Sequence, residues 1–536
     1  MELVRLIDDL RDSGFAPRVV RGDAVNLRVL DITEDSRTAM PGSLFIARTG
    51  TQADGRRFAA DAVELGAVAV LTDDPGALPD GLDACVIVCL KLPEAVARLG
   101  ERFYGEPSAK LFVAGITGTN GKTTVAHLAH RLLNAAGVRT GLIGTVEIDD
   151  GRERAPAAMT TPPALEVSRT LGVMVESGCR AMVMEVSSHA LDQRRVDGVA
   201  FDAGVFTNLT GDHLDYHGSM DAYAAAKKRL FGLVDAHGGV SIVNGHDERA
   251  GTMTGSRAEF CWAIDAVGAE LFDVPMQGEF DEPAWTVRTK DRSGTAMLLE
   301  IGGPWGRGQA GGPISSWVEL IGAHNAMNTL QAVAVAWHAM REIGIDADES
   351  KARIARALTL VTTPRGRLEV VSGDDDLVTV LVDYAHTDDA LRHALGAART
   401  VVPEGRRLWA VFGAGGERDR TKRPRMGAVA GGLADRVVVT SDNPRSESPS
   451  AIISEIVAGI PEDRRNAMDV QADREKAIAF AVRTAEPGDV VVIAGKGHET
   501  EQVLPGPDGR MVRRRFDDRA EAQRTLADRR REAGRA

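Results

Sequence analysis

Runs of consecutive apolar residues alternate with stretches of helical periodicity along most of the chain. In the first hundred residues the strand-like runs are SLFIA, AVAVLT and CVIVCL, and a helical pattern, ADGRRFAADAVEL, lies between the first two. Strands that are apolar throughout are typical of parallel sheets covered by helices on both faces. This part of the sequence predicts a small α/β domain, to which we assign residues 1–108.

The same alternation begins twice more. From Leu111 the run LFVAGI leads through a glycine-rich turn into TTVAHLAHRLLNAAG, and the runs AMVMEV, AGVFT and VSIVN follow. The third series consists of VTVLVD, RLWAVFG, DRVVVTS and DVVVIAG. We assign residues 109–360 to a central parallel-sheet domain, closed by the helix AHNAMNTLQAVAVAWHAM, and residues 361–536 to a doubly wound, Rossmann-like domain. The glycine-rich stretch GGPWGRGQAGGP predicts a hairpin loop, and the tail from Arg513 predicts a solvated mixed-charge helix.

Length and composition agree with about three globular domains. The 536 residues are 43% hydrophobic and 26% charged, which is close to the average of globular proteins. The net charge is −13, from 64 basic and 77 acidic residues, and there is no long basic run, so we expect neither a nucleic-acid nor a membrane partner. Small-molecule ligands and a monomeric protein are expected instead. Only ten of the basic residues are Lys, so a Lys inside a motif is a candidate for chemistry.

The amino terminus and the cysteines predict a soluble cytoplasmic protein. The segment MELVRLIDDL is acidic and lacks the apolar core of a signal peptide, and no run of 18 apolar residues occurs. The four cysteines form neither a CxxC pair nor a zinc spacing, so we expect buried free thiols.

The segment AGITGTNGKTT at 114–124 lies between a predicted strand and a predicted helix. In that context backbone N–H groups cradle phosphate oxygens, Lys122 neutralises the terminal phosphates, and the Thr123 hydroxyl can ligate magnesium. The segment departs from a strict Walker A motif because Ile116 stands where the first glycine belongs, and a glycine-rich turn without a ligand is the alternative. The residues expected around the nucleotide are Gly118, Thr119, Asn120, Gly121, Lys122, Thr123 and Thr124.

Two further residues follow neighbouring predicted strands. Glu185 ends AMVMEV, and His213 follows AGVFT. Ligands of open parallel sheets collect at the carboxyl ends of the strands, so these side chains are candidates to complete a magnesium site beside the phosphate loop. Taken alone, each is more typical of an ordinary polar loop residue. The NKxD motif of switch GTPases and the HRD and DFG motifs of protein kinases are absent from the sequence.

Nine motifs occur in the order and spacing of the Mur ligases, and the similarity extends from TEDSR near residue 33 to FDDR near residue 516. This resemblance implies three domains, one each for a UDP-sugar, ATP and an amino acid. It also implies an ATP-dependent amide ligation on UDP-MurNAc-L-Ala-D-Glu, through an acyl phosphate, in peptidoglycan synthesis. Such chemistry needs cations and oriented dipoles rather than a protein nucleophile. The motifs are GITGTNGKTT, EVSSHAL, NLTGDHLDYHGSMDAYAAAKKRLF, AHNAMN, PRGRLE, DYAHTDDAL, GAGGERDRTKRPRM, SDNPR and AGKGHE.

The resemblance gives several residues a role. It assigns Lys122 and the loop backbone to the β- and γ-phosphates, Thr123 and Glu185 to one magnesium ion, and His213 to a second. Lys227, in AYAAAKK, aligns with the lysine that the family carbamylates, although the residue alone is more typical of a helix surface. Further contacts to ATP are implied for His324, Asn325, Asn328, Arg367 and Asp383.

The DNPR box at 442–445 resembles the form that is selective for meso-diaminopimelate. Arg445 is a fork-shaped donor suited to a carboxylate that lysine lacks. The resemblance places Asp442 and Asn443 beside it, Glu499 with the Gly495 carbonyl on the ammonium, and Arg418 on another carboxylate. A ligase for L-lysine or another amino acid is one alternative, and a nucleotide-binding protein without ligase activity is the other.

Matches to the UDP-sugar contacts are scattered along the chain. Two prolines follow Thr161 where the family often has Gly or an acid, and Asp388 stands in DYAHTDDAL where the family usually has Pro. The implied contacts are Ser36, Thr160, Thr161, Ser187, Gln193 and Arg195, with Thr51 and Gln52 as further candidates.

Overall fold

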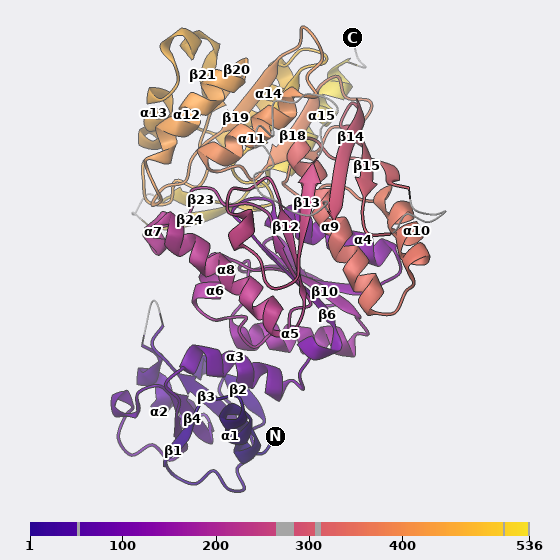
Figure 1. The fold of residues 1–536 in the computed structure, drawn as a ribbon. Helices are drawn as coiled ribbons and strands as arrows, with labels where there is room; N and C mark the ends of the chain where they lie inside the picture. The colour runs from indigo at the N-terminus through magenta and orange to yellow at the C-terminus, as the bar shows by residue number, and fades with distance from the viewer. Residues whose placement is uncertain (51–53, 264–283, 306–311, 507–509, 534–536) are drawn as a thin grey trace. The chain divides into compact units, whose positions relative to one another are not determined.

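The computed structural model describes residues 1–50, 54–263, 284–305, 312–506 and 510–533 (Figure 1). Its contacts divide into two compact units, one made of residues 1–260 and 333–350, the other of 261–332 and 351–536. Each of the three domains expected from the sequence has a sheet of its own, so the α/β prediction is confirmed. The boundaries between the units differ from the expected domain bounds, because they fall at 260/261, 332/333 and 350/351, all inside the expected central domain.

The first unit begins with a five-stranded sheet in the order β1-β5-β4-β3-β2. Leu44 and Ile46 of β3 contribute to a core shared with α1 and α3, whereas Phe45 and Ala47 contribute to a second core with α2. Successive side chains of a strand point to opposite faces, so an uninterrupted apolar strand fills both cores. The elements are α1 (Leu3–Asp12), β1 (Arg18–Arg21), β2 (Asp31–Thr33), β3 (Ser43–Ala47), α2 (Ala59–Glu64), β4 (Ala69–Thr72), β5 (Cys85–Val88) and α3 (Leu92–Phe103).

The same unit contains a second sheet, in which β12, β11, β6, β10 and β7 are parallel in that order and β8 and β9 continue antiparallel. The phosphate loop leaves the carboxyl end of β6, which lies between β10 and β11. The elements are β6 (Phe112–Thr117), α4 (Lys122–Ala135), β7 (Thr140–Ile143), β8 (Glu147–Asp149), β9 (Arg154–Pro156), α5 (Ala164–Glu176), β10 (Ala181–Glu185), α6 (Ser188–Asp192), β11 (Ala203–Phe206), α7 (Leu214–His217), α8 (Met220–Ala236) and β12 (Val240–Asn244).

The stretch that follows contains the predicted glycine-rich hairpin. Strand β15 pairs antiparallel with both β14 and β16, and residues 306–311 of the connection lie outside the described residues. Two helices follow, and the first of them is the helix that the sequence predicts to close the central domain. The elements are β13 (Ala258–Ala263), β14 (Trp285–Ser293), β15 (Ala296–Gly302), β16 (Ile314–Val318), α9 (Ala323–Glu342) and α10 (Ala347–Leu358).

The second unit ends in a six-stranded sheet of order β17-β18-β22-β19-β20-β21, parallel except for β17. A two-stranded sheet, β23 with β24, accompanies it. The elements are β17 (Glu369–Val370), β18 (Thr379–Asp383), α11 (Asp388–Arg399), β19 (Leu408–Phe412), α12 (Lys422–Leu433), β20 (Arg436–Val439), α13 (Pro449–Ala458), β21 (Met468–Val470), α14 (Arg474–Thr484), β22 (Val490–Ala494), β23 (Glu501–Pro505), β24 (Met511–Arg515) and α15 (Asp518–Ala533).

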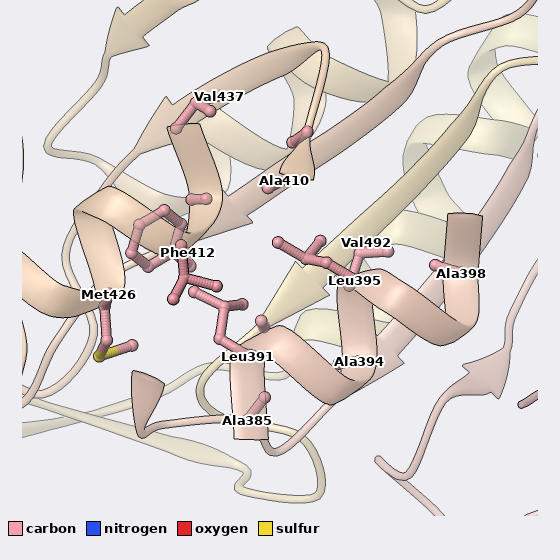
Figure 2. Close-up of a cluster of buried hydrophobic side chains, with 14 of the residues drawn as sticks. Ala385, Leu391, Ala394, Leu395, Ala398, Ala410, Phe412, Met426, Val437 and Val492 are labelled. Atoms are coloured by element: carbon pink, nitrogen blue, oxygen red, sulfur yellow. The ribbon is translucent and has the colours of Figure 1, made fainter. Parts of the chain in front are cut away.

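Helices cover both faces of this sheet. Figure 2 shows Leu391 and Leu395 of α11 and Met426 of α12 packed toward Phe412 and Val492 of the strands. The alternate β22 residues Val491 and Ile493 belong to a second cluster, shared with α14 and α15. A buried side chain of this kind contributes roughly 1.5–3 kcal/mol, so the apolar strands determine the layered fold.

The carboxyl-terminal tail differs from the prediction. Residues 513–515 lie in β24, and α15 begins only at Asp518. Phe516, Ala522 and Leu526 are buried. The predicted mixed-charge helix is confirmed over Asp518–Ala533, but its start at Arg513 and its fully solvated character are wrong. The tail contains a few buried apolar residues among its many charged ones.

All four cysteines are free and buried, as expected. Among the residues that the structure describes, none of the helices has the length and apolar character needed to span a bilayer.

Candidate functional site

The loop at 118–121 connects β6 to α4, which is the strand–loop–helix context that the sequence predicts. Gly118 and Gly121 have φ values of +150° and +86°. A Cβ atom at Gly118 would lie 1.8 Å from Thr207 Oγ1, so this position requires glycine. Asn208, which follows β11, accepts hydrogen bonds from the N–H groups of Thr119 (2.8 Å) and Asn120 (2.9 Å). The segment after β11 thus fixes the loop, a role that the sequence analysis did not assign.

Two lysines converge on one carbonyl of this loop. Lys122 Nζ donates to Gly118 O (2.8 Å) and Thr119 O (2.9 Å), and Lys227 Nζ donates to Gly118 O (2.7 Å). Lys227 lies on α8, is 1% exposed, and has its Nζ 4.4 Å from the centre of the Tyr223 ring. Burial, together with the charge of Lys122, lowers the pKa of Lys227 well below its ordinary value. The Lys227 amine therefore loses its proton more readily than an ordinary lysine does.

Glu185, at the end of β10, is fully buried and accepts three hydrogen bonds. Its Oε2 accepts from the hydroxyls of Thr123 (2.9 Å) and Thr145 (3.0 Å), and its Oε1 accepts from the Thr145 N–H (2.7 Å). Thr145 was not predicted. It follows β7, which pairs with β10, so the rule that selected Glu185 also applies to it.

The oxygen donors of Glu185 and Thr123 suit magnesium, which prefers hard oxygen ligands and usually shares them with substrate phosphates. The described residues contain no group of three or more His, Cys, Asp or Glu side chains that could hold a metal by themselves. The charges of Lys122 and Lys227 both act on His213, so its ring lies near the two lysines that contact the Gly118 carbonyl. The His213 ring packs 4.9 Å from that of His189, and its pKa is lowered mainly by burial. Lys227, as an amine, donates its hydrogen bond and offers no anionic ligand. The assignment of Thr123, Glu185, His213 and Lys227 to magnesium stays a prediction.

Residues assigned to the UDP-sugar extend from Glu185 as a chain of hydrogen bonds. Thr161 donates its hydroxyl to Glu185 O (2.8 Å), and the Ser187 N–H donates to that hydroxyl (3.1 Å). Arg195 Nη1 donates to Thr161 O (2.7 Å), and Arg195 Nη2 donates to Gln193 Oε1 (2.7 Å). These contacts bring four of the predicted residues together.

Thr160 joins the same network through Thr145, whose hydroxyl lies 3.0 Å from its own. Pro163 immediately precedes α5, so the two prolines after Thr161 start a helix.

Ser36 lies in the N-terminal domain, in the short 3-10 helix Ser36–Thr38. It makes no hydrogen bond to the Thr161 network among the contacts of the described residues. Arg48 and Glu34, which form an ion pair (2.6 Å), interact electrostatically with Arg195 of the Thr161 network. Burial is the main cause that lowers the pKa of Arg195; the charge of Arg48 lowers this pKa further, and the charge of Glu34 raises it. Thr51 and Gln52 lie outside the described residues.

His324, Asn325 and Asn328 belong to the second unit, in the first turns of α9. Asn328 Nδ2 donates to Asn325 Oδ1 (2.9 Å), and Asn325 Nδ2 donates to Ile321 O (2.8 Å). Burial lowers the pKa of His324 to about 4, with a further contribution from His393, whose ring centre is 6.5 Å away. His324 is therefore a neutral imidazole at neutral pH, which suits contact with an uncharged ring.

Arg367 and Asp383 also lie in the second unit, near Tyr384. The carboxylate of Asp383 accepts the N–H groups of Leu368 (2.7 Å) and Ala385 (2.8 Å), and burial raises its pKa against the opposing effect of Arg367. The Arg367 guanidinium lies 4.7 Å from the centre of the Tyr384 ring.

The departure from the family pattern at Asp388 has a simple local explanation. Thr387 caps α11 by accepting the Ala390 N–H, and Asp388 is the first helical residue. Pro is favoured at that position, and an acidic side chain there is stabilised by the helix dipole, so Asp preserves the turn.

Arg445 lies against the GAGGERD segment and donates to one of its glycine carbonyls. Its φ is +55°, its N–H donates to Val503 O (3.1 Å), and its Nη1 donates to Gly416 O (2.5 Å). A Cβ at Gly415 would lie 3.2 Å from Arg445 Nη1 and 3.8 Å from Arg418 Cγ, so Gly415 separates the two predicted carboxylate donors.

The other predicted amino-acid contacts lie together at the ends of β20 and β22. Asn443 Nδ2 donates to Glu499 Oε2 (2.8 Å), and a Cβ at Gly495 would lie 3.4 Å from Asp442 Oδ2. Burial raises the pKa of Tyr384, and the carboxylates of Glu499 and Asp442 raise it further while Arg367 and Arg418 oppose them. These four charged groups therefore lie close enough to Tyr384 to act on its pKa.

A fully buried ion pair supports this arrangement. Arg474 of α14 donates to both carboxylate oxygens of Asp518 at 2.7 Å, and both side chains are 0% exposed. The same guanidinium donates to Ser441 O (3.3 Å) and Ala494 O (2.9 Å), which follow β20 and end β22. Arg474 thus forms hydrogen bonds to the ends of both strands, β20 and β22, that precede the DNPR and GKGHE segments.

We expect Arg474→Met to lower the free energy of unfolding by about 3–5 kcal/mol, because Asp518 is left as a buried and unpaired charge. The matched control is Arg483→Met, since Arg483 is also on α14 and pairs with Asp528 and Glu532 of α15, but is 45% exposed. Its cost should stay within about 1 kcal/mol. Urea denaturation measures both, and equal losses would contradict the role of the buried pair.

A second buried arginine connects the GAGGERD segment to the residues after DNPR through hydrogen bonds. Arg423 is fully buried and donates to Glu447 (2.9 and 3.0 Å), Glu455 (2.8 Å) and Gly415 O (3.2 Å). Its hydrogen bonds are the main cause that lowers the pKa of Glu447 from 4.5 to about 2.

The lowered pKa of Glu447 predicts an acid-sensitive contribution to stability. The folded state favours the charged carboxylate, so this contribution is complete above pH 4.5 and is lost as the pH falls toward about 2. We expect the wild type to lose more stability than Glu447→Gln between about pH 6 and about pH 3 in denaturant titrations. Glu462→Gln, whose side chain is 91% exposed, is the control and should follow the wild type. Parallel curves for wild type and Glu447→Gln would refute the assignment.

Three domain families match successive parts of the chain. Residues 29–104 match the Mur ligase family catalytic domain, residues 116–336 the Mur ligase middle domain, and residues 366–497 the Mur ligase glutamate ligase domain.

Curated relatives and solved structures are similar over nearly the full length. A UDP-N-acetylmuramoyl-L-alanyl-D-glutamate--2,6-diaminopimelate ligase from Synechococcus elongatus is 41% identical over 94% of this chain and 95% of its own. The enzyme of that name from Geobacillus thermodenitrificans is 39% identical over 94% and 96%. A solved structure of an enzyme with this name has a TM-score of 0.63 at 30% identity, covering 95% of this chain and 97% of its own. A MurF ligase from Thermotoga maritima solved with ADP shares the fold, with a TM-score of 0.58 at 17% identity over 95% and 99%. The chain therefore belongs to the Mur ligase family.

Proposed function

We propose that this chain is an ATP-dependent ligase that adds meso-2,6-diaminopimelate to UDP-MurNAc-L-Ala-D-Glu, a step of peptidoglycan synthesis. The observation that carries the proposal is the convergence of Arg445, Arg418, Asn443, Asp442 and Glu499 around the ends of β20 and β22. This set offers donors for a carboxylate and acceptors for an ammonium, which are the two groups at the distal end of diaminopimelate. The names of the relatives support the same substrates.

The first step activates a carboxylate. A carboxylate resists attack by an amine because it is negatively charged and has no good leaving group. Its oxygen therefore attacks the γ-phosphorus of ATP, the bond from that phosphorus to the bridging oxygen breaks, and an acyl phosphate and ADP form. Lys122 and the N–H groups at the start of α4 offset the charge on the phosphates as it moves to the leaving oxygen. We assign the loop residues Gly118 to Thr124 to this role, with His324, Asn325, Asn328, Arg367 and Asp383 as further ATP contacts.

The second step forms the amide. The amino group of the incoming amino acid attacks the acyl carbon, the carbon–oxygen bond to phosphate breaks, and orthophosphate and a proton leave. The tetrahedral intermediate carries negative charge, so fixed cations and dipoles are the groups that lower its barrier. We assign Ser36, Thr160, Thr161, Ser187, Gln193 and Arg195 to holding the UDP-linked acceptor for this attack.

Magnesium fits the oxygens of Thr123 and Glu185, and when bound it would neutralise phosphate charge. His213 and a carbamylated Lys227 are our proposed ligands for a second ion. Lys227 is suited to that modification because its pKa is depressed: the ammonium loses its proton readily, and the neutral amine then adds CO2 and releases a second proton, which leaves an anionic oxygen ligand.

We further propose that the protein works as a monomer in the cytoplasm, with the domain bounds 1–108, 109–360 and 361–536. The aligned domain families begin and end inside those bounds.

Orthophosphate release tests the proposal. We expect release only when ATP, UDP-MurNAc-L-Ala-D-Glu and meso-diaminopimelate are all present, because the acyl phosphate needs the acceptor and its turnover needs the amine. Release that is independent of acceptor and amino acid would favour a nucleotide-binding protein without ligase activity. Equal or faster release with L-lysine would favour the lysine-adding alternative.

A further inference from the structure

A buried lysine lies among the residues assigned to the amino acid. Lys496 follows β22 in the AGKGHE motif and is 0% exposed. Its Nζ lies 2.9 Å from Glu499 Oε2, 3.2 Å from Asn443 Oδ1 and 3.9 Å from Asp442 Oδ1. We call these four residues the carboxylate–lysine cluster. The proposed function gives roles to three of them and none to Lys496.

Hydrogen bonds hold the cluster in one arrangement. Glu499 Oε2 accepts from both Lys496 Nζ (2.9 Å) and Asn443 Nδ2 (2.8 Å), while Asn443 Oδ1 accepts from Lys496 Nζ and from the Val503 N–H (3.0 Å). Lys496 therefore fixes the orientation of both side chains. Both bonds go to Oε2 of Glu499, so Oε1 takes part in neither of them.

The charge of Lys496 is also needed in the cluster. Asp442 is 6% exposed, and its Oδ1 has no hydrogen-bond partner among the described residues. Two carboxylates, Asp442 and Glu499, thus lie at the border of a buried region, and an uncompensated charge there is costly. Lys496 Nζ lies within 4 Å of a carboxylate oxygen of each. The buried Arg474 also interacts electrostatically with both, but its guanidinium is already paired with Asp518.

This charge balance bears on which amino acid the cluster accepts. The distal end of meso-diaminopimelate carries a carboxylate and an ammonium, whereas that of L-lysine carries only an ammonium. Without Lys496, the negative charge of Asp442 and Glu499 would be offset less, and it would repel the ligand carboxylate and attract a lone ammonium.

We propose that Lys496 is a positioning and specificity-determining residue, which orients Glu499 and Asn443 and offsets the negative charge of Asp442 and Glu499 so that a substrate with a distal carboxylate is accepted. This inference rests on the proposed function. Lys496 would thus help to discriminate between diaminopimelate and lysine together with Arg445, although Lys496 is buried and does not offer the paired N–H donors of an arginine.

Steady-state kinetics of the full-length Lys496→Met variant test the inference. We expect the KM for meso-diaminopimelate to rise at least ~10-fold while the KM for ATP stays within ~2-fold, since like charges then face the ligand carboxylate. L-Lysine is measured as a substrate or as a competing inhibitor of meso-diaminopimelate turnover, and its affinity should be unchanged or higher. Lys476→Met is the matched control, because Lys476 is an exposed lysine of α14 in the same domain, and it should behave as the wild type.

Two further variants separate charge from hydrogen bonding and from folding. Lys496→Gln keeps a donor without the charge and should lose discrimination as Lys496→Met does; it also serves as the test if Lys496→Met fails to fold. Lys496→Arg keeps the charge and should retain the preference for meso-diaminopimelate, even at a lower kcat.

An equal loss of affinity for both amino acids in Lys496→Met and Lys496→Gln would overturn the inference while leaving the proposed function intact. A wild-type protein that makes no product with meso-diaminopimelate would instead overturn the proposed function, and the inference with it.

Discussion

Replacing Lys227 by Ala is expected to remove most of the ligase activity, by roughly 10²–10³-fold in kcat, because the proposed carbamate, an anionic ligand for the second magnesium ion, can no longer form. Excess bicarbonate or a short-chain carboxylate such as acetate should restore part of it by supplying an oxygen anion in the space that Lys227 vacates. Initial rates with saturating substrates measure both effects.

Lys228→Ala provides the control, since Lys228 is the next residue on α8 but is exposed, whereas Lys227 is 1% exposed. We expect wild-type rates from Lys228→Ala with and without added carboxylate. Loss of activity in Lys227→Ala without rescue by any carboxylate would argue against carbamylation, and a mass spectrum of the wild type at high bicarbonate provides an independent check.

Much of the fold could be predicted because both faces of its sheets are buried. A run such as SLFIA is apolar at every position since alternate residues enter two different cores. The short strand β1, with the sequence RVVR, is exposed at all four positions and has no such signal, so it was not predicted. The buried face of the tail was not predicted, because Phe516 before α15 and Ala522 and Leu526 within it stand among many charged residues.

The candidate site was predictable where it follows directly from the strand order. Glu185 and the phosphate loop lie at the carboxyl ends of β10 and β6, as the pattern predicts. Contacts between distant segments carry no such signal: the partner of Arg474 is Asp518, 44 residues away, in a helix of mixed charge. The position of His213 relative to Glu185 likewise depends on the conformation of the loop after β11, which sequence periodicity does not determine.

Reversing the charge of Arg445, in the variant Arg445→Glu, is expected to lower kcat/KM for meso-diaminopimelate roughly 30-fold or more. Loss of a charge-assisted contact to a carboxylate costs about 2–5 kcal/mol, and the new carboxylate adds repulsion. The KM for ATP should change little, because the Arg445 side chain contacts Gly416 of the GAGGERD segment rather than the phosphate loop.

Arg406→Glu is the control for this charge reversal, since Arg406 is an exposed arginine of the same domain. It should leave both kinetic constants near the wild-type values. A uniform loss of diaminopimelate use and ATP binding in Arg445→Glu, accompanied by a lower melting temperature, would indicate misfolding and would count against a specific role for Arg445.

The most direct test of the proposed function is a competition experiment. The wild-type protein is given ATP, magnesium, UDP-MurNAc-L-Ala-D-Glu and equal concentrations of meso-diaminopimelate and L-lysine, and the products are weighed by mass spectrometry. We predict that nearly all of the product is the UDP-MurNAc-tripeptide that ends in diaminopimelate, with one orthophosphate released for each molecule formed. A product that contains mainly lysine, or ATP hydrolysis without any tripeptide, would contradict the assignment.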